Sequence, residues 1–418
     1  MKIIDVIQSR IGRNSIFSVL DQLLSIGMNL VLAILFARFL GPYSLGQYTL
    51  AVTIVGVIGL FSNFGILPVL NRAIAKSEKK TSIYLGNALG IKLFISFPLL
   101  FLITILVVIV LDYSMDTIYV IILIIIYNTL LSLISYAGAA LVSLHRNDIV
   151  LKLNVINKSA SLFFAFILLF FGSTLEYLLY AFIIISFLSF LYSFYEIKNL
   201  ILNFNILFNF RFINKFIYVS FPLVFASAAE FISLKVDTIF IGSMLGEESA
   251  GHYSAAYSVF MGAIFIPLAL TKVFFPNFVS LCQFDMKGAF KLLSRYRNYF
   301  LIYSLIIGLI FYFFANYIIM LIFGDGFSSS INILQFLSLA LFSIILNRLY
   351  NYVLIALKED RFYFYISFSG ALVNVSLNFF LIPVYGIVGA AVSTIITELL
   401  VFILSISRVN KIIACNEI

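Results

Sequence analysis

Apolar segments long enough to cross a lipid bilayer recur along almost the whole chain of 418 residues. An α-helix needs roughly 18 to 20 apolar residues to span a hydrocarbon core of about 30 Å, and several segments reach that length. Only 11% of the residues are charged, against about 25% in soluble globular domains. The segments are continuous rather than alternating in hydropathy, which excludes a β-barrel. The sequence therefore predicts an all-α polytopic membrane protein.

The apolar segments and the polar stretches between them predict about twelve transmembrane helices. The first follows a basic tail and has no cleavage site behind it, so we interpret it as an uncleaved span and not as a signal peptide. The predicted spans cover residues 15–37, 45–69, 88–111, 117–141, 149–171, 175–197, 216–243, 250–270, 299–322, 331–356, 362–382 and 386–407.

Charge placement gives an independent test of this topology. Nearly all of the 26 Lys and Arg residues lie in the two tails and in every second connection. By the positive-inside rule these connections and both termini are cytoplasmic. The opposite connections carry acidic residues instead, namely Asp112, Asp116, Glu176, Glu247, Glu248 and Asp325.

One cytoplasmic connection, residues 271–298, carries a basic helical face. Lys287, Lys291 and Arg295 follow one another at a spacing of four. This pattern predicts an amphipathic helix lying on the anionic inner leaflet of the membrane.

A twelve-residue segment occurs twice, first at Leu40–Ala51 and again at Leu245–Ala256. Six of the twelve positions are identical, and each copy lies between the first two predicted spans of its half. A repeat at half the chain length predicts two related six-helix lobes, as in many transporters. The predicted lobes are residues 1–200 and 216–418, joined by a cytoplasmic linker at 201–215.

Each copy of this repeat contains two glycines, Gly41 and Gly46 in the first and Gly246 and Gly251 in the second. Glycines are favoured where the backbone needs a positive φ angle or approaches another backbone closely. We therefore expect a tight reversal of the chain at each copy.

Charged residues inside predicted spans are the strongest indication of a functional site. Each costs about 2.5–3.5 kcal/mol at the bilayer centre, so such residues should face the interior of the helix bundle or water. There are eight of them within or at the ends of spans: Asp21, Arg38, Lys92, Glu230, Lys235, Asp237, Arg348 and Glu398.

Polar residues share helical faces with several of these charges. Asp21 and Asn29 lie on one face of the first span, and Glu230 and Asp237 lie on one face of the seventh. The remaining amides are Asn347 and Asn351 beside Arg348, and Asn374 and Asn378 in the eleventh span. Such stripes either enclose a hydrated cavity or pair as contacts between helices.

A cavity with several cations and many amides suits an anionic substrate rich in hydroxyl groups. Arg and Lys bind phosphate oxygens, and Asn, Ser and Tyr satisfy sugar hydroxyls. Arg38, Lys235 and Arg348 are the candidate cations, with Asn29, Asn347, Asn351, Asn374 and Asn378 as further substrate-binding candidates. Asp21, Glu230, Asp237 and Glu398 are candidate charge partners or carriers of a coupling ion, either a proton or sodium.

Other function classes lack the residues that they require. With only two histidines, expected on opposite sides of the membrane, the chain offers no zinc site or histidine-based triad, and we expect no catalytic residue and no bound metal. It also has no Gly-Lys-Ser/Thr phosphate-binding loop and no soluble catalytic domain. The topology accounts for the net charge of +8, so the charge does not indicate nucleic acid as a partner.

Three segments carry a family resemblance: Ala37–Pro42 with Gly46–Tyr48, Asp237–Gly242 with Leu245–Gly246 and Gly251–Tyr257, and Ile382–Ala391. They resemble the polysaccharide-transporter branch of the multidrug/oligosaccharidyl-lipid/polysaccharide exporter superfamily, and the flippases of O-antigen and capsule repeat units in particular. The resemblance implies two six-helix lobes in a V around a central cavity. It also implies alternating access, a bacterial inner (plasma) membrane location and an undecaprenyl-diphosphate-linked oligosaccharide as substrate, with no cofactor.

Two rival functions remain open at this point. A multidrug exporter of the same superfamily would prefer lipophilic cations in an aromatic-lined site. A membrane-embedded polysaccharide polymerase or ligase belongs to a different class and usually presents a large outer loop, whereas every predicted outer loop here is short. Membrane lipids, a polysaccharide polymerase and a chain-length regulator are candidate partners of a flippase.

Overall fold

The computed structural model describes the backbone of residues 10–77, 80–111, 113–144, 146–201, 205–209, 216, 231–232 and 235–416. It describes side chains within these ranges from residue 27 to residue 414, apart from residue 75. Every regular element in the described residues is a helix, as the continuous apolar segments predict. Ten of these helices are long and apolar enough to cross a membrane. The chain is therefore an all-α, multi-pass membrane protein.

The spans differ from the prediction mainly where two predicted helices join. Spans one and two share one label, α2 (Arg10–Ser62), but they are two helices that adjoin at Gly41, whose φ and ψ angles are not helical. Span seven falls largely outside the described residues. Spans four, five, six, ten and eleven agree with the helices to within a few residues. The third begins earlier, at Thr81, the eighth ends later, at Phe284, the ninth begins earlier, at Met286, and the twelfth ends later, at Ala414. A break after Ser62 divides the second.

The chain divides into two compact units. Unit 1 comprises Met1–Leu40 and Ala51–Ala228, and unit 2 comprises Gly41–Leu50 and Ala229–Ile418. The boundary between the units, at Ala228 and Ala229, falls in the seventh predicted span, where the residues are not described. The lobe boundaries and the relation of the lobes by an internal repeat stay predictions.

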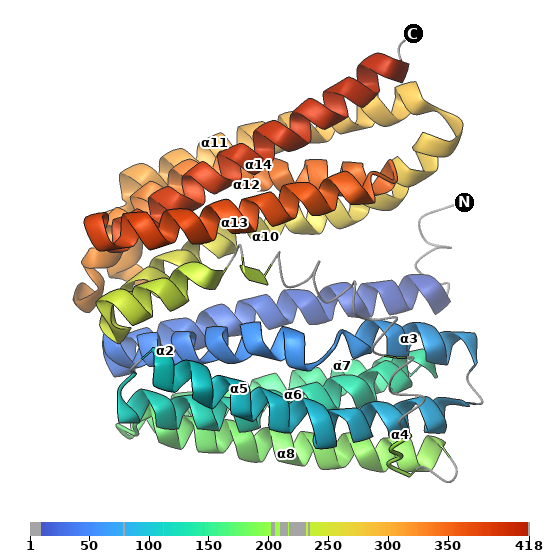
Figure 1. Ribbon diagram of the computed structural model, residues 1–418, viewed down its shortest axis with the longest axis vertical. Coiled ribbons are helices and arrows are strands. Elements are labelled where there is room, and N and C mark those ends of the chain that lie inside the picture. The colour runs from blue at the N-terminus through green and yellow to red at the C-terminus, as the bar shows by residue number, and fades with distance from the viewer. Residues whose placement is uncertain are drawn as a thin grey trace. The chain divides into compact units, whose positions relative to one another are not determined.

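Unit 1 contains most of α2 and the helices that follow it, through to the linker. Within this unit α6 and α8 lie side by side, and α7 packs against α8 (Figure 1). The bounds are α3 (Ile66–Lys76), α4 (Thr81–Ile91), a π-helical turn η2 (Lys92–Ser96), α5 (Phe97–Val110), α6 (Met115–Ser143), α7 (Asn147–Phe170) and α8 (Leu175–Leu200).

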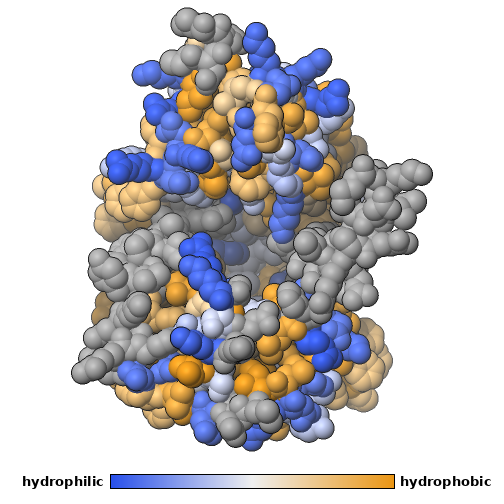
Figure 2. All heavy atoms as spheres, turned by 90° about the vertical axis from the view of Figure 1, so that its right-hand side faces the viewer, coloured by the Kyte–Doolittle hydropathy of each residue, from blue (hydrophilic) through white to orange (hydrophobic). Residues whose placement is uncertain are grey.

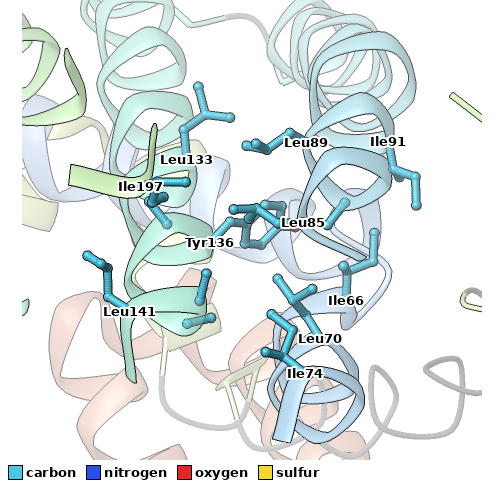
Figure 3. Packing of buried hydrophobic residues seen from close by; sticks show 14 of the residues in the cluster. Ile66, Leu70, Ile74, Leu85, Leu89, Ile91, Leu133, Tyr136, Leu141 and Ile197 are labelled. Atoms are coloured by element: carbon cyan, nitrogen blue, oxygen red, sulfur yellow. The ribbon is translucent and has the colours of Figure 1, made fainter. Parts of the chain in front are cut away.

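A buried cluster holds α3, α4 and α6 together at one end of unit 1 (Figure 3). Ile66 and Leu70 come from α3, Leu85 and Leu89 from α4, and Tyr136 from α6. All five side chains are less than 4% exposed, so their burial stabilises this end of the unit through the hydrophobic effect.

Unit 2 is built around α12 (Ser329–Ala356), which packs against α10, α11 and α14. Helix α13 packs mainly against α14 (Figure 1). The other bounds are a helical stretch at residues 235–245, α10 (Glu247–Phe284), α11 (Met286–Ile322), a short 3₁₀ turn η3 (Asp325–Phe327), α13 (Asp360–Tyr385) and α14 (Ile387–Asn416).

The amphipathic segment predicted at residues 271–298 is not a separate interfacial helix. Helix α10 continues to Phe284, and α11 begins at Met286 and runs unbroken for 37 residues. At 1.5 Å per residue α11 is about 56 Å long, more than a bilayer core needs. Lys287, Lys291 and Arg295 are exposed on its first turns, so the basic face exists but belongs to the transmembrane helix. The sequence of α11 contains no proline, which is consistent with one unbroken helix.

Acidic residues of the predicted outer connections begin helices. Asp116, Glu176, Glu247 and Glu248 lie in the first turns of α6, α8 and α10. A carboxylate is favoured there by the positive end of the helix dipole. In Figure 2 hydrophilic side chains gather on unit 2 at the end to which the last turns of α14 point.

The repeated glycines show both features for which glycine is favoured, a positive φ angle and a close approach to another backbone. Gly41 has φ 79° and ψ −178°, and Gly246 has φ 87° and ψ 172°, so the first glycine of each copy bends the chain in the same way. A Cβ atom on Gly46 would lie 1.7 Å from the carbonyl oxygen of Glu247, and one on Gly251 would lie 1.9 Å from that of Pro42. Within unit 2 the two copies therefore pack backbone against backbone.

A side-chain hydrogen bond accompanies this glycine contact. Ser254 donates from Oγ to Oγ1 of Thr49 over 2.9 Å, and these two residues hold the same position in the two copies. The contact is thus reciprocal: equivalent residues of the two copies meet each other.

Candidate functional site

Asp237 is the centre of a buried polar cluster in unit 2. Its side chain is 1% exposed and lies in the helical stretch 235–245. Three helices supply donors to its carboxylate: Tyr253 of α10 over 2.7 Å, Asn378 of α13 over 2.5 Å and Thr394 of α14 over 2.9 Å. The carboxylate therefore ties α10, α13 and α14 to its own helix.

The Asp237 cluster retains bonding capacity after these three hydrogen bonds. The three hydrogen-bond donors are neutral, and the Lys235 ammonium acts on the carboxylate electrostatically without a described ion pair. Asn378 donates to Oδ1 of Asn374 over 3.1 Å, while its own Oδ1 is buried without a partner among the described residues. Carboxylate, amide and hydroxyl oxygens converge here, which is the donor set that hard cations prefer.

Glu398 forms a second polar centre in the same unit. Asn347 of α12 donates from Nδ2 to Glu398 Oε2 over 2.6 Å and to the Glu398 carbonyl oxygen over 2.9 Å. Arg348, the next residue of α12, lies within electrostatic range of Glu398. One turn further, Asn351 accepts a hydrogen bond from Ser405 of α14 over 3.4 Å.

Tyr257 of α10 connects the two centres. Its side chain is only 6% exposed, and the Lys235 ammonium lies 4.7 Å from the centre of its ring, a distance at which a cation is attracted to the ring face. Asp237, Arg348 and Glu398 all act electrostatically on its hydroxyl. The two predicted cations and two of the predicted acids of unit 2 therefore gather around one tyrosine.

The predicted site residues do not all belong to this cluster. Arg38 and Asn29 lie on the part of α2 that belongs to unit 1, and both are exposed. Asp21 lies on the same helix, but its side chain is outside the described residues, as is the whole of Glu230. The roles proposed for these four residues stay predictions.

Sequence reasoning missed three residues of the cluster. Tyr253 and Tyr257 were noted only as part of the repeated motif, and Thr394 was not singled out. One signal for Tyr253 was available, because it occupies the position of Tyr48 in the other copy of the repeat. Tyr257 follows one turn later on the same helix, so it shares a face with Tyr253.

A comparison with models of protein families shows the family of this chain. The family model described as "Polysaccharide biosynthesis protein" matches residues 11–282. The chain belongs to this polysaccharide biosynthesis family. A comparison with curated proteins gives no match.

Solved structures show the same fold at low sequence identity. A lipid II flippase, MurJ, in an inward closed conformation is 18% identical with a TM-score of 0.74, over 94% of this chain and 87% of that one. An inward-facing multidrug resistance transporter of the MATE family is 15% identical with a TM-score of 0.70, over 92% and 94%. A MOP superfamily transporter from Pyrococcus furiosus is 12% identical with a TM-score of 0.60, over 98% of each chain. The polysaccharide biosynthesis protein thus has the fold of the MOP superfamily.

Proposed function

We propose that this polysaccharide biosynthesis protein is a flippase. It carries undecaprenyl-diphosphate-linked oligosaccharide units, such as those of O-antigen or capsule, from the cytoplasmic to the outer leaflet by alternating access. The observation that supports this most strongly is the cluster of Lys235, Arg348, Asp237 and Glu398 around Tyr257 in a membrane-embedded unit. Family membership supports the polysaccharide pathway, and the fold of MurJ, a lipid II flippase, supports a lipid-linked substrate.

The residues of the cluster have separate tasks in this proposal. The Arg348 guanidinium binds phosphate oxygens in a bidentate manner, and Lys235, held over Tyr257, supplies a second positive charge. On α12, Asn351 offers its amide to sugar hydroxyls, and Asn347, whose Nδ2 is bonded to Glu398, offers its Oδ1. The polyprenyl chain stays in the lipid while the polar headgroup crosses through the protein.

Asp237 is the coupling site in this proposal. A buried carboxylate surrounded by amide and hydroxyl oxygens can hold either a sodium ion or a proton, and ionisable groups inside membranes commonly do so in transporters. Four elements meet at Asp237, so loading its carboxylate changes the contacts of all four. A cation that enters down its gradient supplies about 2.3 kcal/mol per charge for each 100 mV.

The wider setting follows from the same proposal. The protein resides in the bacterial inner (plasma) membrane with both termini in the cytoplasm, because the basic connections lie on the side of the termini. It acts as a transporter and not as an enzyme. A polysaccharide polymerase and a chain-length regulator receive its product on the outer face.

Replacement of Arg348 tests the substrate assignment. We expect Arg348→Ala to abolish appearance of lipid-linked oligosaccharide on the outer face while the units accumulate on the inner face. The matched control is Arg361→Ala, because Arg361 is exposed at the start of α13. Protein levels of both variants are compared by immunoblot. Unchanged export by Arg348→Ala would remove the assignment, and normal polysaccharide with altered drug tolerance would point to a multidrug exporter.

A thermal melt tests the coupling site without needing the substrate. If Asp237 binds sodium, replacing KCl by NaCl at equal ionic strength should raise the melting temperature, since a ligand at 100 times its Kd stabilises by about 2.7 kcal/mol. Asp237→Asn should abolish this shift and Asp360→Asn, an exposed control, should preserve it. A melt indifferent to sodium together with transport that follows a pH gradient would assign a proton. Transport that follows neither gradient would contradict coupling at Asp237.

A further inference from the structure

Unit 1 contains a buried lysine that the proposed transport cycle does not use. Lys92 lies inside the candidate span Thr81–Val110, and its side chain is 0% exposed. It is among the largest fully buried side chains of the described residues. An ionisable group in this position is expensive for a membrane protein to keep, and it usually has a function.

Among the described residues, the amine of Lys92 has a single partner, which is neutral. Nζ donates to Oδ1 of Asn63 over 2.5 Å, and no described ion pair involves Lys92. An ammonium group has three donors, so two would stay unsatisfied in the interior if the group were charged. Four residues on, the hydroxyl of Ser96 is also buried without a partner among the described residues. An uncharged amine therefore fits this environment better than an ammonium ion does.

Both residues of this hydrogen bond lie where a membrane helix is interrupted. Lys92 begins the π-helical turn η2, in which the Phe97 amide bonds to the Lys92 carbonyl oxygen. Pro98 follows in the first turn of α5, and its missing N–H and its ring prevent a regular α-helix here. Such π turns occur frequently at functional sites.

Asn63 begins the break between α2 and α3. Phe64 and Gly65 follow with φ of 51° and 59°, and α3 begins at Ile66. Pro68 in the first turn of α3 has no N–H to donate to the preceding turn, which favours the start of a new helix here. Two interrupted helices are thus joined by one hydrogen bond from Lys92.

Other titratable groups on the surrounding helices leave Lys92 without a charged partner. Arg72 and Lys76 are on α3, and Asp116, Tyr119, Tyr127 and Tyr136 are on α6. None of these six makes a described ion pair or hydrogen bond with Lys92, and no charge of the described residues acts on it. Protonation of Lys92 would therefore place an uncompensated charge between α4 and the break in α2.

We propose that Lys92 is a proton-binding site of unit 1. Its amine is uncharged while it is packed against Asn63, and it takes up a proton from water when the two interrupted helices separate. The lone pair of Nζ accepts the proton, and the same proton returns to water before the helices close again. In the transport cycle, which rests on the proposed function, this step links bending at the two breaks to the proton concentration.

A single tryptophan gives a direct reading of this protonation. The chain contains no Trp, so Phe94→Trp introduces the sole tryptophan two residues from Lys92 in the same π turn. Phe94 is 63% exposed, so a larger ring can be accommodated. The emission of the purified full-length protein is followed from about pH 5 to about pH 9.5, below the range where ordinary tyrosines titrate.

The proposal predicts one titration step in the reporter protein and its disappearance in Lys92→Met and in Lys92→Arg. Lys152→Met is the matched control, because Lys152 is an exposed lysine of α7, and it should preserve the step. Asn63→Asp should also remove the step, since a carboxylate beside Nζ keeps the proton bound, whereas Asn63→Ala should preserve it.

Three results would overturn the proposal. The first is an emission that does not change with pH in the reporter protein. The second is a step that persists in Lys92→Met. The third is full transport with an unchanged pH profile by Lys92→Arg, which would show that a fixed positive charge suffices and that Lys92 serves as an anion-binding residue. If Lys92→Met fails to fold, Lys92→Arg and Asn63→Asp still decide the matter. The tryptophan reading is independent of any substrate, so it separates a failure here from a failure of the proposed function.

Discussion

A single methyl group at Gly251 should destabilise unit 2, although alanine is the better helix former. The Cβ atom of Gly251→Ala would lie 1.9 Å from the carbonyl oxygen of Pro42. Carbon and oxygen approach to about 3.3 Å at closest, so the two backbones must separate by about 1.4 Å. Overpacking of this kind costs about 1–3 kcal/mol, and we take about 3 because backbone meets backbone. Helix propensity returns about 1 kcal/mol, which leaves a net loss of about 2 kcal/mol.

Gly262→Ala in the same helix is the matched control. Nothing lies within 4 Å of its added Cβ, so it should stabilise by up to about 1 kcal/mol. For a domain of about 200 residues, 1 kcal/mol shifts the melting temperature by about 2–4 °C. Thermal melts in detergent should therefore place Gly251→Ala about 4–8 °C below the parent and Gly262→Ala slightly above it. Equal melting temperatures for the two variants would refute the close backbone contact.

Gly46→Ala extends this test, because its Cβ would meet the Glu247 carbonyl oxygen in the same contact. Once either alanine has separated the two backbones, the other methyl group has room. The double variant should therefore lose less stability than the sum of the two single losses. Additive losses would show that the two glycines pack in separate places.

Two further contacts in unit 2 give predictions of their own. Asn347→Ala leaves the partly buried carboxylate of Glu398 without its 2.6 Å donor. It should lower the free energy of unfolding, measured by chemical denaturation, by about 1–3 kcal/mol. No loss would show that water replaces the amide. Glu359→Gln weakens the bidentate pair with Arg408, whose two closest contacts are 2.9 Å, and should lower the melting temperature by a few degrees in low salt and less in high salt. A salt-independent effect would contradict the electrostatic explanation.

The spans could be predicted because each depends on local composition alone. A run of apolar residues is itself the physical requirement for crossing a bilayer, and charges at its ends fix its orientation. The connections between consecutive helices were harder to predict. A single non-helical residue, Gly41, joins the first two helices where a longer loop was expected, and Asp285 alone separates α10 from α11. Polar residues predict where a helix meets water but not whether the helix stops there.

The sequence predicts most residues of the candidate site, but it does not predict which of them contact one another. Periodicity places Asp237 on a helical face, yet the donors to its carboxylate come from α10, α13 and α14. Which helices meet is decided by tertiary packing, and hydropathy carries little information about it. Thr394 is one of many hydroxyl residues in an apolar helix, so nothing local distinguishes it. Lys92 was recognised as a charge within a span, but its contact with Asn63 needed the structure.

In the proposed flippase, the charges of the cluster give a coupling ion a specific task. Lys235 and Arg348 are matched by Asp237 and Glu398, so a diphosphate with one negative charge on each phosphate would enter a balanced site and leave it negative. Unbalanced charge is costly where water is excluded. A cation at Asp237 cancels part of the excess, so substrate and cation should favour each other's binding.

Asp237→Asn should imitate the loaded state permanently. At an effective dielectric constant of about 20, two unit charges about 12 Å apart interact by about 1.4 kcal/mol, which is about tenfold in affinity. The variant should bind a short-chain prenyl diphosphate about tenfold more tightly in calorimetry and lose the dependence of binding on the cation. The Tyr253 and Thr394 hydroxyls can turn to accept from the new amide, so the fold should survive. Weaker binding with the cation dependence intact would show that Asp237 is only a structural contact between helices, and the coupling ion would then have to act elsewhere.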